Sequence, residues 1–239
     1  MSYAGFRFAV LALAAAVGQS QTVISAKAGL VYFVTGNVSI AGSGPLAGGS
    51  VNRQLSQGDI LVTADGRAEV LLNPGTVLRI GANTRVRMDS LALTDTHLSL
   101  ESGSTVMTLR DAPKLAHVTI HAGNSIVTPA TAGIYRLDAD SPPALRVFRG
   151  EAEASEEQQP VSAKRGQSVR LSDLQLAKFN PHDADEFQQW AETRGTPPPT
   201  PMLPAMICLS PPSMNAPASA TKMADFQAYL KECQHLDPR

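Results

Sequence analysis

The chain has 239 residues, of which 43% are hydrophobic, 17% charged and 5% aromatic. Its 20 basic and 21 acidic residues leave a formal net charge of −1, which argues against nucleic acid or an acidic membrane surface as a partner, because both attract a basic face. The apolar content excludes a disordered chain, while 18 glycines and 17 prolines favour short strands and turns over helices.

Residues 1–20 have the pattern of a secretory signal peptide. Arg7 is the only charged residue before the ten-residue apolar run Phe8–Val17, and small residues at Gly18 and Ser20 suit cleavage. The run is shorter than the ~20 residues of a helix that spans a membrane. We therefore expect a periplasmic or secreted protein with no stable membrane insertion after the signal is cleaved.

Alternation of apolar and polar residues recurs through residues 25–180 and predicts half-buried strands. The clearest alternating sets are Val31 and Phe33, Val38 and Ile40, Ala68, Val70 and Leu72, Val118 and Ile120, and Leu145 and Val147. Turn segments separate them, and in Asn73-Pro-Gly-Thr76 we expect Gly75 to supply the positive φ of a type II turn. Many short strands and turns predict an all-β fold, either a rolled sheet or a sandwich.

Two glycine-centred segments occur twice in the same order. Val34-Thr-Gly36-Asn-Val38 is similar to Phe148-Arg-Gly150-Glu-Ala152, and Gln57-Gly58-Asp59-Ile-Leu61 is similar to Arg165-Gly166-Gln167-Ser-Val169. A glycine within a strand marks a bulge or a corner, so these segments predict a sheet that folds over twice. Duplication and chance similarity in a β-rich sequence both explain the repeat.

At these residues the chain resembles the FecR domain family, named for periplasmic sensor proteins of ferric citrate. The resemblance covers roughly residues 29–170, and its core stretch runs from Gly58-Asp59 through Leu78. It implies an all-β domain without catalytic residues or a cofactor. The residues that carry the motif, to which we assign structural roles, are Gly36, Gly58, Asp59, Gly66, Gly75, Gly150 and Gly166.

The resemblance also implies a place in signalling. In the sensor proteins the domain receives a signal from an outer-membrane receptor, and a transmembrane helix passes the signal to a cytoplasmic anti-sigma segment. Neither pattern is recognisable in this sequence beside the FecR-like region. We therefore carry over only the extracytoplasmic part of the role and not direct regulation of a sigma factor.

A short helix is predicted after the strands, over residues 181–194. Asp183 would cap it, with Glu186 completing a capping box. Phe187, Trp190 and Arg194 recur at helical spacing on one face. We expect this face, which carries the only tryptophan, to pack on the β-domain.

The C-terminal residues predict a spacer and a last helix. Residues 195–218 are proline-rich and would form an extended spacer or a coil along the domain. Residues 219–239 carry an apolar helical stripe that would dock on its own domain or on another protein. Both cysteines, Cys208 and Cys233, lie in this region, and in an exported protein they predict a disulfide.

The histidines do not predict a metal site. His117 and His121 share one face of a predicted strand, but four residues of extended chain separate them by about 13 Å. One metal ion would bind both only at a bend, because its ligands lie at about 2.1 Å. His97 and His182 would join them only through a contact made by the fold.

The acidic residues offer one weak catalytic pattern. Glu151 and Glu153 lie roughly 6.5 Å apart on one face of a predicted strand, a separation found in glycosidase carboxylate pairs. Glu156 and Glu157 follow them directly, which is typical of a solvated strand end. Asp138 and Asp140 match the start of a calcium-binding loop. The central Gly and the closing Glu of such a loop are missing from this sequence.

We therefore expect a non-catalytic, exported FecR-domain protein of the bacterial cell envelope. It would act as a protein-interaction, sensory or scaffold module, and an unidentified envelope protein would bind its edge strands. The alternatives are an envelope glycan hydrolase that uses Glu151 and Glu153, and a glycan-binding module, which needs several exposed aromatic faces. A deep cleft at the two glutamates would favour hydrolysis, and a convex edge would favour interaction.

Overall fold

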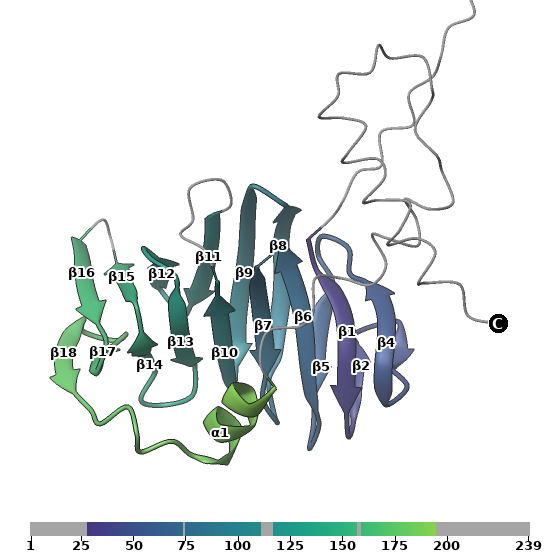
Figure 1. Ribbon diagram of the computed structural model, residues 1–239. Helices are drawn as coiled ribbons and strands as arrows, with labels where there is room; N and C mark the ends of the chain where they lie inside the picture. The colour runs from purple at the N-terminus through teal and green to yellow at the C-terminus, as the bar shows by residue number, and fades with distance from the viewer. Residues whose placement is uncertain (1–27, 74, 111–116, 157–158, 195–239) are drawn as a thin grey trace, which may run out of the picture.

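Strands with one apolar face bury that face when two sheets stack, and the described chain does so with two nine-stranded sheets around one core (Figure 1). The computed structural model describes residues 28–73, 75–110, 117–156 and 159–194. The prediction of an all-β fold is confirmed, and the architecture is a sandwich.

The strands divide between two sheets, which we call sheet A and sheet B. Sheet A contains β1 (Leu30–Thr35), β4 (Gly49–Gln54), β6 (Arg67–Asn73), β7 (Thr76–Ile80), β10 (Ser104–Leu109), β13 (Gly133–Asp138), β14 (Ala144–Arg149), β17 (Gln167–Arg170) and β18 (Gln175–Lys178). Sheet B contains β2 (Val38–Ile40), β3 (Gly44–Pro45), β5 (Ile60–Thr63), β8 (Arg85–Ala92), β9 (Asp95–Ser102), β11 (His117–Ala122), β12 (Ser125–Pro129), β15 (Glu151–Glu156) and β16 (Gln159–Lys164).

The strand order in each sheet nearly follows the chain. It is β18-β17-β14-β13-β10-β7-β6-β1-β4 in sheet A and β16-β15-β12-β11-β9-β8-β5-β2-β3 in sheet B. The chain passes back and forth between the sheets while it advances from one end of the sandwich to the other. Strands β9 and β11 pair in parallel, because β10 between them lies in sheet A and the chain returns to sheet B in its original direction.

Strand β1 departs from the predicted alternation. The pairing register of β1 shifts between Val31 and Phe33 against both of its neighbours, β4 and β6. Such a bulge adds a residue and turns the following side chains to the other face. Val31 and Val34 are therefore fully buried, whereas Phe33, which we expected beside Val31, is half-buried on the outer face.

The glycines of the sequence repeat lie where the chain crosses between sheets. Gly36 (φ 65°) leads from β1 to β2, and Gly150 (φ 91°) leads from β14 to β15. Gly58 (φ 89°) precedes β5 and Gly166 (φ 77°) precedes β17, but the first crossing runs from sheet A to sheet B and the second from B to A. Gly58 and Gly166 thus do not occupy equivalent places in the fold. This argues that the sequence repeat is a chance similarity and not a duplication.

The helix α1 (Glu186–Thr193) lies against the outer face of sheet A (Figure 1). Its N-cap is Asp185, whose carboxylate accepts a hydrogen bond of 2.9 Å from the Gln188 amide. The expected cap at Asp183 is therefore wrong, because that carboxylate accepts a hydrogen bond from Asn180 instead. The Arg136 guanidinium, 2.6 Å from Asp185, anchors the true cap to sheet A.

Several predicted elements lie outside the described residues. They are the signal sequence 1–20, the spacer 195–218 and the last helix 219–239 with Cys208 and Cys233. Within the described ranges, no helix is both long and apolar enough to cross a membrane.

Candidate functional site

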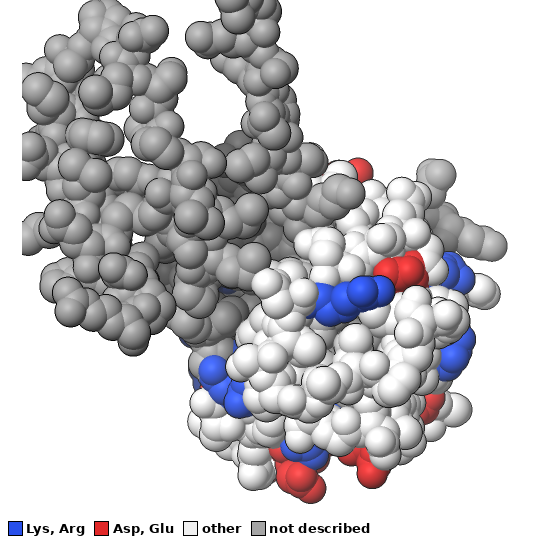
Figure 2. Space-filling model, turned by 90° about the vertical axis from the view of Figure 1, so that its right-hand side faces the viewer, with Lys and Arg blue, Asp and Glu red and all other residues white. Residues whose placement is uncertain are grey.

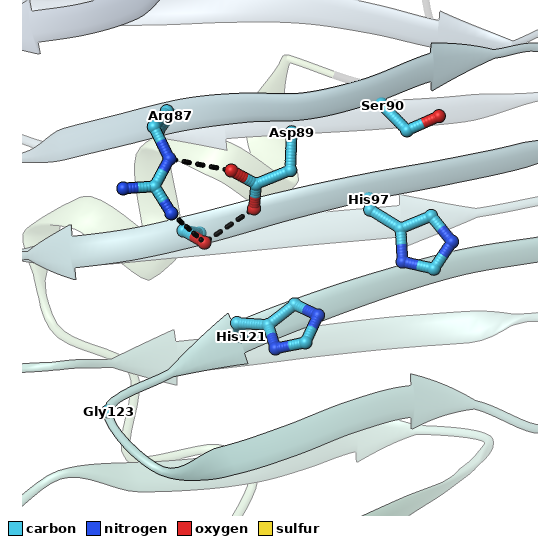
Figure 3. A pocket seen from close by; sticks show the side chains of 7 residues that line it. Arg87, Asp89, Ser90, His97, His121 and Gly123 are labelled. Carbon is cyan, nitrogen blue, oxygen red and sulfur yellow. Dashed lines mark hydrogen bonds and ion pairs between the residues drawn. The ribbon is translucent and has the colours of Figure 1, made fainter. Parts of the chain in front are cut away.

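The outer face of sheet B presents polar side chains along β8, β9 and β11. On β9, Thr96, Leu98 and Leu100 are buried, so that the alternate residues point away from the core. The same alternation on β11 buries Val118, Ile120 and Ala122 and turns the histidines outward. These outward side chains line an open pocket of about 470 Å³ (Figure 3), whose lining includes Arg87, Asp89, Ser90, His97, Ser99 and His121.

One side of this pocket is an ion-paired cluster on β8 and β9. Arg87 donates to Asp89 at 2.6 Å, to Glu101 at 3.1 Å and to the Ser99 hydroxyl at 3.1 Å. Ser99 in turn donates to Asp89. Partial burial opposes ionisation of Asp89, but hydrogen bonds from Ser99 and Arg87 outweigh it and lower the pKa of that carboxyl. Asp89 is therefore a carboxylate at neutral pH.

The other side of the pocket brings together two histidines from different strands. His97 lies on β9 and His121 on β11, and their ring centres are 6.4 Å apart. His97 Nε2 lies 3.0 Å from the Asp95 carboxylate. The parallel register pairs His97 with Thr119 and Ser99 with His121, which makes the two histidines diagonal neighbours on one face.

The structure separates the other two histidines of its described residues from this pair. His117 is exposed at the start of β11, and His182 is exposed between β18 and α1. Neither belongs to the lining of the pocket. Of the two histidines that only a contact of the fold could bring to His121, the neighbouring strand brings His97 there, whereas His182 lies elsewhere. The cluster of Arg87, Asp89 and Ser99 was missed, although alternation in Arg85-Val-Arg87 and His97-Leu-Ser99 marks its outward face.

The glutamates of the hydrolase hypothesis lie elsewhere. Glu151 accepts a hydrogen bond of 2.7 Å from Ser162 on the edge strand β16, and its carboxylate is 3.9 Å from Lys164 Nζ. Glu153 is exposed on β15, the strand that also carries Glu151. Neither glutamate lines the pocket on β8, β9 and β11. The partners of Glu151, Ser162 and Lys164, thus face solvent at the edge of sheet B.

The aspartates of the calcium-loop pattern hold strands together instead. Asp138 accepts hydrogen bonds from Arg136 and Arg146, both at 2.9 Å, and from Ser104 at 2.6 Å. Asp140 accepts one of 3.1 Å from the Gly103 amide. The two carboxylates therefore connect β10, β13 and β14, and they do not form a common cation site.

The motif residues of the FecR-like pattern lie in turns and at crossings between the two sheets. A Cβ on Gly66 would lie 2.6 Å from the carbonyl oxygens of Thr35 and Asn37, so that only glycine fits this crossing. Asp59 accepts a hydrogen bond of 2.8 Å from the Ser56 amide and closes the turn that contains Gly58. Gly75, between β6 and β7, has a φ of 105°.

A second polar cluster is buried on sheet A beneath α1. Glu69 and Arg79 are each 1% exposed, and their charged groups are 3.5 Å apart. Glu69 also accepts hydrogen bonds from Tyr32 and from Arg194 after the helix. Burial and the bond to Glu69 raise the pKa of Tyr32. This cluster is closed over by the protein's own side chains, which indicates a structural role.

Where described residues are visible on the end of the sandwich that carries β3 and β4, their charges do not form a patch of one sign. Basic and acidic side chains are scattered over this face among uncharged ones (Figure 2). This agrees with the net charge of −1.

Comparisons with known proteins find distant similarity only. No family model matches the sequence, and no curated protein is significantly similar to it. Two crystal structures of a "putative anti-sigma factor from Parabacteroides distasonis ATCC 8503" are 17% and 16% identical to this chain, each with a TM-score of 0.43. Each match covers 56% of this chain and 63% of the other, so that this chain spans less than two thirds of those proteins.

Proposed function

We propose that this chain is a non-catalytic, FecR-like interaction module of the bacterial cell envelope, which binds another protein by strand addition. The observation that carries the proposal is strand β18 at the end of sheet A. All four of its residues are exposed, and Leu176 is 46% exposed. An edge strand offers unpaired backbone groups to an incoming strand, and an exposed apolar side chain adds contact area.

The other edge strands are less suited to this role. Pro45 in β3 and Pro160 in β16 each lack the backbone N–H that a new strand would use. β4 is longer, but none of its side chains is among the exposed large hydrophobic ones of the described residues. β18 combines an open edge with an exposed leucine, which makes it the favoured contact.

Site-specific photo-crosslinking tests the edge contact. A photo-reactive residue at position 176 should capture a discrete partner in intact cells. The matched control is position 126, because Ile126 is similarly exposed (38%) but lies on the central strand β12. Equal cross-linking from both positions, or none from position 176, would contradict binding at the β18 edge.

The hydrolase alternative has its own test. Purified protein is incubated with peptidoglycan and a panel of glycans, beside Glu151→Gln and Glu153→Gln variants. We expect no sugar release from any of the three, because Glu151 is occupied by Ser162 and Lys164 at the rim of sheet B. Release by the unmodified protein that disappears in either variant would establish hydrolysis, since loss of a general acid or base lowers turnover by orders of magnitude.

A further inference from the structure

The two histidines of the sheet B pocket face each other across an open gap. Figure 3 shows a ring nitrogen of His97 and one of His121 on the facing sides of the two rings. The ring centres are 6.4 Å apart and the ring planes are tilted by 32°. With metal–nitrogen bonds of about 2.1 Å, two imidazoles on one ion have ring centres roughly 5 to 6.5 Å apart, depending on the bond angle. The observed separation lies at the upper end of this range, where the two nitrogens bind nearly opposite positions of the ion.

Asp95 is placed to orient the His97 ring for metal binding. The Asp95 carboxylate lies 3.0 Å from His97 Nε2, and in the tautomer that carries its proton on Nε2, towards this carboxylate, the lone pair of the ring is on Nδ1. Metal-binding histidines usually donate their second nitrogen to a carboxylate in this way, which fixes the tautomer and orients the ring. Within the described residues, no hydrogen bond to the His121 ring is found, so that its nitrogens are available.

The charges around the pair favour a cation over an anion. The carboxylates of Asp89, Asp95 and Glu101 lie on the same face as the guanidinium groups of Arg85 and Arg87. The three carboxylates exceed the two guanidinium groups by one negative charge. Asp89 is the carboxylate that interacts electrostatically with His121. An imidazole pair beside such a surface suits divalent ions of copper, nickel or zinc, whereas magnesium and calcium prefer oxygen ligands alone.

We propose that His97 and His121 bind a divalent transition-metal ion on the outer face of sheet B, with Asp95 as the positioning residue of His97. The described residues contain no group of three or more His, Cys, Asp or Glu that could hold a metal, so that water completes the coordination. The site goes beyond the proposed function, because it lies on central strands of sheet B and not at the β18 edge.

Copper binding to the full chain tests the site. Copper is the sensible probe, because its divalent ion binds most tightly among the first-row metals. The chain is used without a histidine tag and with any free thiol alkylated, and binding is followed by calorimetry and by electron paramagnetic resonance. We expect the two-nitrogen splitting of the copper signal to be lost in His97→Asn and in His121→Asn, with affinity lowered roughly tenfold or more.

Matched variants separate this site from binding elsewhere. His182→Asn makes the same chemical change at an exposed histidine outside the pocket, and His117→Asn makes it on the same strand as His121; both should leave copper binding unchanged. Asp95→Asn should weaken binding roughly tenfold without changing the urea midpoint, and Asp95→Glu should restore it in part. Absence of copper binding to the unmodified chain, or equal losses in His97→Asn and His182→Asn, would overturn the proposal.

Discussion

At the scale of single residues, the crossings between the sheets leave no room for a side chain. A Cβ on Gly66 would lie 2.6 Å from two backbone carbonyl oxygens, which cannot move away as a flexible side chain does. We expect Gly66→Ala to destabilise the fold by about 1–3 kcal/mol or more, as overpacking does. Urea unfolding, followed by tryptophan fluorescence or circular dichroism, measures this loss.

Variants at two other glycines separate the steric cause of the destabilisation from the cost of a left-handed backbone conformation. Gly58 has a φ of 89° with no atom within 4 Å of an added Cβ, so that Gly58→Ala should cost only the strain of the left-handed conformation, about 1–2 kcal/mol. Gly48 has neither a positive φ nor a close neighbour, and Gly48→Ala should cost nothing. Equal urea midpoints for the variants at residues 66 and 48 would refute this account of the crossings.

At the scale of elements, α1 is held on sheet A by arginines that contact aromatic rings and carboxylates. The Arg194 guanidinium lies 3.8 Å from the Phe33 ring centre, and that of Arg67 lies 5.3 Å from the Trp190 ring centre. Glu69 lies beneath the helix between Arg79 and Arg194. The bulge in β1 matters here, because it turns Phe33 outward to meet Arg194.

The charge of Glu69 is therefore expected to control the docking of α1. Glu69→Gln removes the carboxylate that faces two arginines in a buried cluster, and loss of one partner from such a cluster typically costs about 3–5 kcal/mol. Glu186→Gln makes the same change in an exposed pair with Arg67 and should leave stability unchanged, because the side chain is 88% exposed. Thermal unfolding compares the two, and similar melting temperatures would contradict a buried role for Glu69.

At the scale of the whole molecule, the sequence predicts a covalent link beyond the sandwich. A Cys208–Cys233 disulfide would close a loop of about 25 residues and contribute roughly 3–4 kcal/mol by restricting the unfolded chain. It would fasten the proline-rich spacer to the last helix. Intact-mass analysis of exported protein after alkylation, with and without reductant, decides this. Two alkylated thiols in the unreduced sample would show that the disulfide is absent.

The sequence by itself determined which faces of most strands are buried, because alternation at period two follows directly from the geometry of extended chain. Val70, Val118 and Val147 are buried where their spacing predicts, and the repeated glycines lie at turns between the sheets. These are local inferences, and they depend on no knowledge of which strands pair.

The tertiary structure decided what requires pairing and register. His97 and His121 meet because β10 crosses to sheet A and leaves β9 and β11 as parallel neighbours, and spacing along the chain does not encode that route. Glu69 occupies an outward position by alternation, yet it is buried because α1 covers it. Phe33 changed face through one inserted residue in β1. Each outcome depends on contacts between distant segments, whose energies exceed the local preferences that a sequence pattern expresses.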